Sequence, residues 1–474
     1  MTKPIKKIAV VGAGIAGLAT AHRLCHSTSV TVYEASDRLG GALQTTDHDG
    51  YRVEHSADMF VTQPDEAVRL CRELGIEDQL IVPNSANRFS SIVQDNRLIR
   101  IPVGFSLMVP NQIAPVLKSP LLSSLGKFRF LMERFCQPKN SNADESLKSF
   151  AVRHYGTEFF ERIIQPLVAG IYSAKAEDLS MHATLRRFVD MEEQYGSLIK
   201  AAANTNRKKE VEQQSSGARY GMFVTPKNGF SSLIDTIAQN LKDVEVRLNS
   251  LVDSVATDET GTWQIKCGSS QQTYDGVVLA TSANVAANQI SQLDPELSDL
   301  LKSIQFGSMI VVTIQCDSSS FPVEFPTGFG FVVPEIENRK LIACSFSSNK
   351  FAGRSPEGKF LLRAFLGGRK IRESITMNDQ QIQQTVCEEL KQLIGYQHND
   401  AAIYRVFRWE NCMPQYRVGH LELIDRVDQK VQGHPGLALA GSSYKGVGIP
   451  ACIHSGQQAA DRMIDCLVNE STTT

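Results

Sequence analysis

A glycine-rich turn near the N-terminus constrains the fold of this chain more than any other feature. Residues 6–11, KKIAVV, are typical of a buried parallel strand, and Gly12, Gly14 and Gly17 follow with the spacing GxGxxG. The first glycine permits a tight turn, the second lets backbone amides approach a pyrophosphate, and the third lets the next helix pack closely on the sheet. The helix N-terminus would offer its free N–H groups to the phosphates. The loop consists of Gly12, Ala13, Gly14, Ile15, Ala16 and Gly17.

A second β-rich run, VTVYE at residues 30–34, completes a strand–helix–strand unit. It ends in Glu34, about 20 residues after the glycines, where an acidic side chain can accept a hydrogen bond from a ribose hydroxyl. A glycine turn between a strand and a helix, followed by this acid, is much more specific than GxGxxG alone. The N-terminal region therefore predicts a doubly wound α/β domain that binds a dinucleotide.

Backbone-permissive sequence returns near the C-terminus, in the run LALAGSSYKGVGIP at residues 437–450. We interpret it as a short buried strand, a turn and the start of a last helix. Gly441 permits the turn, and Gly446 and Gly448 let main chain pass close to a ligand. Because a late strand can return to the sheet edge where the first glycines lie, we expect both ends of the chain to enclose one cofactor.

Length and composition narrow the class of protein. A chain of 474 residues is long enough for two or three domains. Its formal net charge of −2 argues against a nucleic-acid partner. Ten cysteines without a CxxC pair or a close His/Cys cluster predict reduced thiols and no metal site. The glycine turn comes too early for a removable signal sequence, and no apolar run reaches about 18 residues, so we expect a cytoplasmic protein without a membrane-spanning helix.

Several stretches carry a resemblance to a known family. Residues 34–41, EASDRLGG, resemble the second fingerprint of flavoproteins of the amine-oxidase type. Residues 441–460, GSSYKGVGIPACIHSGQQAA, resemble the ending of the porphyrinogen oxidases, and 165–184, QPLVAGIYSAKAEDLSMHAT, and 408–420, RWENCMPQYRVGH, are similar to inner segments of that family. The likeness extends over nearly the whole chain. It implies FAD as the cofactor and oxidation of a porphyrinogen to the porphyrin as the activity of an FAD-dependent oxidoreductase.

The resemblance places the FAD contacts on the glycine loop and on several later segments. In the second fingerprint, Gly40 and Gly41 let backbone pass close to the flavin end of FAD, and Arg38 supports the phosphates. The further contacts that it implies are Glu34, Ala35, Ala42, Ser56, Ala57, Asp58, Met59, Val252, Trp409, Gly441, Ser442, Val447, Gly448 and Ile449. One segment departs from the family pattern: residues 55–58 read HSAD where family members more often have a glycine-containing turn.

The same resemblance indicates how the substrate is held. A porphyrinogen is a large apolar disc with propionate arms, which needs an apolar slot and a cation at the rim. Arg88 matches an arginine that grips a propionate, a role that suits the planar guanidinium; without the resemblance it would be interpreted as a solvated surface arginine. Gly170 and Phe351 match residues of the cavity wall. Since the cofactor carries the chemistry, we name no catalytic base.

The implied reaction removes six electrons from protoporphyrinogen IX in three flavin cycles with dioxygen as the acceptor, as a step of heme biosynthesis. The run NRF at 87–89 favours this substrate, whereas MPQYRVGH and GFGFVV favour the alternative, coproporphyrinogen III, which has two more propionates. A flavin amine oxidase, a carotenoid-type desaturase and a porphyrin-binding flavoprotein without activity also stay open. Against the amine oxidase, Val311 stands where such enzymes often carry a lysine.

We therefore expect an α/β protein with a Rossmann-like FAD-binding domain, a mixed-sheet substrate domain and a helical subdomain. The FAD-binding domain takes residues 1–60, 221–300 and 409–474, the substrate domain 61–102 and 301–408, and the helical subdomain 103–220. Residues 103–136 are apolar with scattered basic residues, so they either pack within the protein or make a peripheral contact with the inner face of the cell membrane. A homodimer also stays open.

Overall fold

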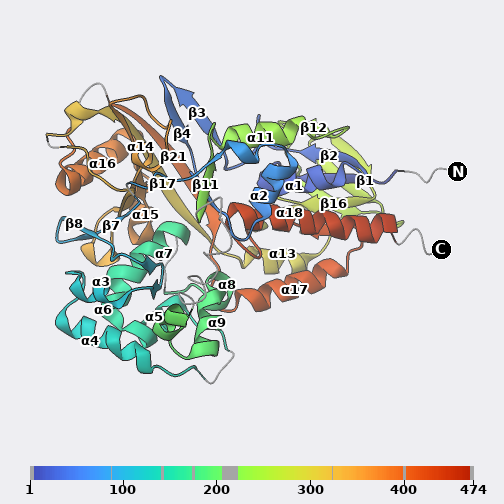
Figure 1. Ribbon diagram of the computed structural model, residues 1–474. Helices are drawn as coiled ribbons and strands as arrows, with labels where there is room; N and C mark the ends of the chain where they lie inside the picture. Colours follow the sequence, from blue (N-terminus) through green and yellow to red (C-terminus); the bar gives the residue numbers. More distant parts are fainter. Residues whose placement is uncertain are drawn as a thin grey trace.

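The computed structural model describes residues 5–86, 88–139, 143–172, 177–204, 222–322, 324–398 and 402–469. Figure 1 shows three parts: a parallel sheet with its helices at the upper right, a mixed sheet at the upper left, and a group of helices below. The predicted α/β fold class is confirmed. Residues 205–220, which we assigned to the helical subdomain, lie outside the described residues, and the domain boundaries stay predictions.

The parallel sheet is assembled from segments that are far apart in the sequence. Its order is β12–β2–β1–β16–β22, and all neighbouring strands are parallel. The strands are β1 (Lys7–Val11), β2 (Ser29–Tyr33), β12 (Glu245–Arg247), β16 (Gly276–Leu279) and β22 (Leu437–Leu439). The late strand β22 thus returns to the sheet that contains the N-terminal unit, as the C-terminal glycine run predicted, and it pairs there with β16 at the edge.

Successive side chains of β1 point to opposite faces of this sheet, so both faces carry a hydrophobic core. Ile8 and Val10 belong to one core, with apolar residues of α1 (Ile15–Leu24), α2 (Glu66–Glu73), α11 (Phe230–Gln239) and α18 (Ile449–Ile464). Ala9 and Val11 belong to the other, with residues of α12 (Ala283–Gln289), α13 (Pro295–Lys302) and α17 (His420–Gln432).

The last helix, α18, packs directly on the first helix, α1 (Figure 1). A Cβ added to Gly456 would lie 2.2 Å from the carbonyl oxygen of Ala16, so only glycine permits this approach. At the same point, the Thr20 hydroxyl donates a 3.0 Å hydrogen bond to the Gly456 carbonyl. The two ends of the chain are therefore held together at the helix that follows the glycine loop.

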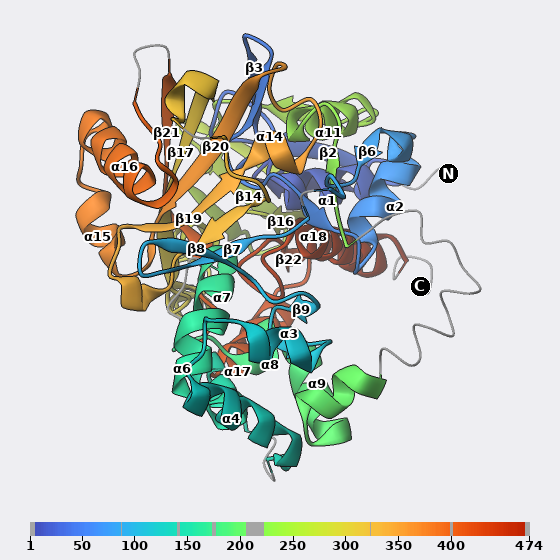
Figure 2. The ribbon, with the colours of Figure 1, turned by 60° about the vertical axis from the view of Figure 1, so that its left-hand side comes forward.

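The mixed sheet has the order β21–β17–β20–β19–β18–β7–β8. Its strands are β21 (Ile403–Pro414), β17 (Phe306–Asp317), β20 (Lys359–Leu366), β19 (Leu341–Phe346), β18 (Gly330–Val332), β7 (Ser91–Gln94) and β8 (Arg97–Arg100). All neighbours are antiparallel except β18 and β7, which are parallel. The helices α14 (Ser347–Lys350), α15 (Ile371–Ser374) and α16 (Asp379–Ile394) accompany this sheet, which Figure 2 shows from another side.

The helical part lies below the mixed sheet in Figure 1 and follows the short hairpin of β9 (Phe105–Ser106) and β10 (Val109–Pro110). Its helices are α3 (Ile113–Lys118), α4 (Ser124–Met132), α5 (Leu147–Tyr155), α6 (Thr157–Phe159), α7 (Gln165–Tyr172), α8 (Met181–Thr184) and α9 (Arg186–Tyr195). Aromatic rings fill its core: Phe130 stacks on Phe159 with 5.5 Å between centroids, and Tyr155 stacks on Phe159 at 4.7 Å.

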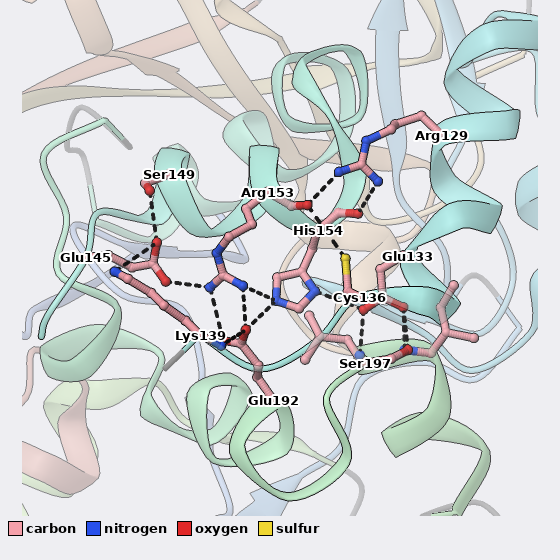
Figure 3. A network of polar contacts seen from close by, with 12 residues as sticks. Arg129, Glu133, Cys136, Lys139, Glu145, Ser149, Arg153, His154, Glu192 and Ser197 are labelled. Carbon is pink, nitrogen blue, oxygen red and sulfur yellow. Dashed lines mark hydrogen bonds and ion pairs between the residues drawn. The ribbon is translucent and has the colours of Figure 1, made fainter. Parts of the chain in front are cut away.

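A buried polar network joins these helices (Figure 3). The imidazole of His154 lies between two carboxylates, with Nδ1 2.9 Å from Glu133 Oε1 and Nε2 3.5 Å from Glu192 Oε1. Glu133 also accepts hydrogen bonds from the Ser197 hydroxyl at 2.7 Å and from the backbone N–H of Leu198 at 2.6 Å. Burial disfavours a charged imidazole, but hydrogen bonds to the two glutamates outweigh it and raise the pKa of His154.

Smaller sheets complete the fold. An antiparallel sheet of β13 (Ser254–Thr257), β14 (Trp263–Cys267) and β15 (Ser270–Tyr274) is separate from a hairpin of β3 (Thr45–His48) and β4 (Tyr51–Glu54). A third sheet joins β5 (Phe60–Val61), β11 (Phe223–Pro226) and β6 (Leu80–Ile81). Among the helices of the described ranges, none combines the length and the hydropathy required to span a bilayer.

Candidate functional site

The glycine loop after β1 has the geometry that its spacing predicted. Gly12 has a φ of 100°, and a Cβ there would lie 2.8 Å from the carbonyl oxygen of Ala280. A Cβ on Gly17 would lie 1.9 Å from the carbonyl oxygen of Gly12, so the helix could not pack here with any other residue. A Cβ on Gly14, in contrast, would meet none of the described atoms within 4 Å. Gly14 therefore faces open space, where a ligand's phosphate group can approach the backbone amides.

The two glycine turns lie against each other. The N–H of Gly40 donates to the carbonyl of Ala13 at 2.8 Å, and Gly14 and Gly40 form a parallel bridge. A Cβ on Gly41 would lie 3.0 Å from the Cα of Gly14. The sequence separates these turns by more than one element, but the fold merges them into a single glycine-lined surface.

Glu34 and Arg38 hold the two turns in place. The Glu34 carboxylate accepts hydrogen bonds from the backbone N–H of Ala13 at 2.8 Å and from that of Ser36 at 2.9 Å. The Arg38 guanidinium donates to the carbonyls of Leu39 at 3.1 Å and of Gly41 at 2.6 Å. Arg38 thus braces the second turn through its backbone, and the neighbouring Ala35 and Ala42 are exposed.

The segment 55–59, which links β4 to β5, connects the glycine turns to the mixed sheet. The Ser56 hydroxyl donates to the carbonyl of Ala42, next to the second turn. From the mixed sheet, Trp409 Nε1 donates to the carbonyl of His55 at 3.1 Å, and Arg363 donates to the carbonyl of Ser56. Ala57, Asp58 and Met59 are half-buried. The predicted contacts Ala42, Ser56 and Trp409 are thereby brought together.

The C-terminal glycine run is fixed by Tyr416, which the sequence did not single out. The Tyr416 hydroxyl donates to the carbonyl of Ser442 at 2.6 Å and accepts from the N–H of Gly446 at 2.7 Å. The ring of His420 stacks on it with centroids 4.0 Å apart, and His420 Nε2 lies 2.7 Å from the carbonyl oxygen of Tyr444. The phenol therefore ties both ends of the loop between β22 and α18.

Two helix N-termini adjoin these glycines. α1 begins after Gly14 and α18 begins after Gly448, and no side chain among the described residues caps either first turn. Val447 is half-buried and Ile449 is buried at the start of α18. Ile15 and Ala16 are buried in the first turn of α1. The open approach at Gly14, the paired glycine turns and two helix ends with free N–H groups together fit an extended, phosphate-bearing dinucleotide.

The remaining predicted residues lie on separate elements. Val252 is buried beside Gln289, whose side chain donates to its carbonyl at 3.1 Å. Arg88 is exposed just before β7, and Gly170 is exposed on α7, which packs against β18 and β19. Phe351 is buried directly after α14, and the Lys350 ammonium and the Arg354 guanidinium lie over its ring at 5.7 and 5.6 Å from the centroid. The assignments of these residues to a substrate stay predictions.

The sequence patterns predicted no role for Lys350 or Arg363, although both are buried beside segment 55–59. A signal for Arg363 was present, because it is the one charged residue in the apolar run FLLRAFLGG. Lys350 gave a weaker signal, since SSNKF is compatible with an ordinary turn.

Comparison with known proteins places this geometry in context. The model of the family described as "Flavin containing amine oxidoreductase" matches residues 15–464. The chain is 32% identical to the coproporphyrinogen III oxidase of Staphylococcus aureus, over 97% of this chain and 99% of that protein. It is 28% identical to the mitochondrial protoporphyrinogen oxidase of Nicotiana tabacum, over 98% and 96%. A solved structure from Exiguobacterium, assigned as a protoporphyrinogen oxidase, superposes with a TM-score of 0.82 at 27% identity, covering 96% of this chain and 98% of that chain.

Proposed function

This chain belongs to the flavin-containing amine oxidoreductase family, and from that membership we propose that it oxidises a porphyrinogen to the porphyrin with FAD, as a step of heme biosynthesis. The observation that carries the proposal is similarity along the whole chain to enzymes named for this reaction, at 32% identity over 97% of its length. The glycine surface, the paired helix N-termini and the C-terminal loop supply the cofactor site that the reaction requires.

The overall chemistry balances as three two-electron oxidations. A porphyrinogen loses six electrons and six protons to become the aromatic porphyrin, and three dioxygen molecules take them up as three hydrogen peroxide. FAD supplies the two-electron acceptor for each round. The protein has to bind the ring system, orient it and exclude water.

We assign these tasks to the residues that the sequence indicated. The turn at Gly12–Gly17 would hold the pyrophosphate, Gly40 and Gly41 would let backbone pass close to the flavin end, and Glu34 would bond the ribose. Segment 56–59, Trp409 and residues 441–449 surround the flavin end. Support comes from the contacts of Ser56 with Ala42 and of Trp409 with the carbonyl of residue 55, which bring these segments together.

For the substrate, we propose protoporphyrinogen IX, with Arg88 gripping a propionate and Gly170 and Phe351 at the cavity wall. Coproporphyrinogen III is the second candidate, because the relative with 32% identity carries that name. The deciding experiment follows porphyrin fluorescence after each chemically reduced porphyrinogen is mixed with the FAD-loaded protein. The control is the same protein stripped of FAD, which measures uncatalysed oxidation.

A higher kcat/KM for protoporphyrinogen IX, with peroxide formed in step with porphyrin, is the expected result. A higher value for coproporphyrinogen III replaces the first candidate by the second. Porphyrin formation no faster than with the stripped protein refutes the proposed activity. Amine turnover in its place would identify a flavin amine oxidase, and tight porphyrin binding without turnover would identify a binding protein.

We further propose that α4 makes the peripheral membrane contact on the cytoplasmic side. Leu125, Phe128 and Phe135 are 81%, 64% and 72% exposed, and they project from the same side of α4 and the turn that follows it. Gly126 and Phe130 on the opposite side are buried in the helical core. Residues 113–139 contain five basic residues and one acid, so the charge suits an anionic lipid surface better than a second copy of the chain.

Flotation with phosphatidylglycerol vesicles tests this contact against neutral phosphatidylcholine vesicles. We expect the protein to float with the anionic vesicles and the double variant Leu125→Ser/Phe128→Ser to lose at least about tenfold in bound fraction. The matched control is Leu251→Ser, at another exposed leucine. Equal flotation of all three proteins contradicts the proposal, and a dimer that the double variant dissociates would assign the face to a second copy.

A further inference from the structure

A group of charged side chains, most of them buried, contacts segment 55–59. Lys350, Arg354 and Arg363 are 7%, 2% and 2% exposed. Two carboxylates accompany them, Glu54 at the end of β4 and Asp58 within the segment. We call these five residues the basic cluster. Charged side chains are rarely buried unless they are paired, so their charge balance is informative.

Asp58 is the centre of the basic cluster. Its carboxylate lies 3.0 and 3.1 Å from the Lys350 ammonium and 3.3 Å from Arg363 Nη1. Arg354 Nη1 is 3.6 Å from Glu54 Oε1, and Arg354 Nη2 donates to the Thr225 hydroxyl at 2.8 Å. Arg363 Nε is buried and has no hydrogen-bond acceptor among the described residues. Three cations thus share two carboxylates, which leaves a surplus of one positive charge.

The titration behaviour of the neighbours agrees with this surplus. Burial opposes ionisation of Asp58, but Lys350 and Arg363 outweigh it and lower its pKa to about 2. Burial raises the pKa of Glu54, although Arg354 and the Thr45 hydroxyl act in the opposite direction. Burial and then the surrounding arginines lower the pKa of His55 to about 4, so this imidazole adds no charge at neutral pH.

The position of the basic cluster relates it to the cofactor. Segment 55–59 is held on one side by Ala42, beside the glycine turns, and on the other by Arg363 and Trp409 of the mixed sheet. Residues on both sides of this segment would hold a dinucleotide bound as proposed, with Gly14 at the phosphates and Trp409 at the flavin end. Because Arg363 and Lys350 contact the segment through Ser56 and Asp58, their charge would act on a cofactor held beside it.

We propose that the basic cluster, through Lys350 and its partner Asp58, sets the electrostatic potential at the flavin so that the reduced, electron-rich state is favoured. This inference rests on FAD binding as part of the proposed function. A flavin that takes up two electrons with one proton gains a negative charge, and a fixed positive charge nearby stabilises that state. Burying this surplus costs folding free energy, and its functional effect would be easier electron transfer from the porphyrinogen.

The midpoint potential of the FAD-loaded protein tests this directly, by reductive titration against a reference dye. Lys350→Met removes the surplus and should lower the potential, whereas Asp58→Asn increases it and should raise the potential. Coulomb's law with an effective dielectric constant of about 20 gives about a tenfold change in the reduction equilibrium for one charge at about 10 Å. Tenfold is about 30 mV for a two-electron couple. The double variant Lys350→Met/Asp58→Asn restores the surplus and should return close to the wild-type potential.

Opposite shifts with recovery in the double variant separate charge from mere structural support, since structural damage would shift both single variants in the same direction. The matched control is Lys359→Met on the same strand as Arg363, where an exposed lysine pairs with Asp317 at 3.0 Å; its potential should not change. Equal potentials in all variants, or a lower potential in Asp58→Asn, overturn the inference. Should Lys350→Met fail to fold, the sign of the shift in Asp58→Asn decides alone. If the variants show the predicted shifts in midpoint potential but the wild-type protein does not turn over a porphyrinogen, the proposed activity is refuted and the inference stands.

Discussion

Removing one hydroxyl at Tyr416 should weaken cofactor binding without unfolding the protein. The phenol makes two hydrogen bonds, to the carbonyl of Ser442 and from the N–H of Gly446, and both belong to the loop between β22 and α18. Each hydrogen bond contributes about 0.5–1.5 kcal/mol, so Tyr416→Phe should reduce the free energy that stabilises the ordered loop by about 1–3 kcal/mol. If that loop must be ordered to enclose FAD, its Kd rises by about 5- to 150-fold.

The assay for Tyr416→Phe is a titration of FAD-free protein with FAD, followed by quenching of flavin fluorescence, beside a thermal unfolding curve. Tyr396→Phe is the matched control, because this buried tyrosine hydrogen-bonds to the hydroxyl of Tyr404 at the mixed sheet, away from the loop. Its FAD affinity should be unchanged. An unchanged Kd in Tyr416→Phe, with a lower melting temperature only, refutes the assignment of the C-terminal loop to the cofactor.

Three further predictions follow from the glycines, the buried histidine and the proposed substrate arginine. Gly14→Val should fold but bind FAD at least about 100-fold more weakly in the same FAD titration. Gly17→Val should lose more than about 3 kcal/mol of unfolding free energy, measured by chemical denaturation of both variants. Because the pKa of His154 is raised in the fold, its stabilisation is complete below its unfolded pKa of about 6.5 and is lost as pH rises through the folded value. Melting temperature should therefore fall on the alkaline side, with a smaller slope in His154→Gln; an equal slope contradicts this role. Arg88→Ala should raise the KM for the porphyrinogen about tenfold and leave bound flavin intact, and loss of flavin at unchanged KM would exclude it from the substrate site.

The sequence predicted those parts of the site whose contacts leave a local pattern. GxGxxG, the acid at Glu34 and the late glycine run each require a spacing that can be recognised by eye, and the fold joins them as expected. The basic cluster leaves no such pattern, because Lys350 and Asp58 are 292 positions apart. Only the position of α14, which ends at Lys350, and the course of segment 55–59 bring them together.

Tyr416 illustrates the same limit within a resembling segment. The run RWENCMPQYRVGH was recognised for Trp409, yet nothing in it shows that the tyrosine seven residues later reaches the loop at residues 442–446. Conversely, the helical core of stacked aromatic rings could be anticipated only as apolar sequence, since ring geometry depends on which helices meet.

The central claim is that both ends of this chain enclose one FAD whose ring accepts electrons from a porphyrinogen. The most direct measurement is the visible spectrum of the FAD-loaded protein under anaerobic conditions while protoporphyrinogen IX is added in small portions. The account predicts loss of the oxidised flavin band, complete at about one third of an equivalent of porphyrinogen, with a porphyrin band appearing in proportion. A protein that stays colourless after incubation with FAD, or a flavin band that persists while excess porphyrinogen is added, would contradict it.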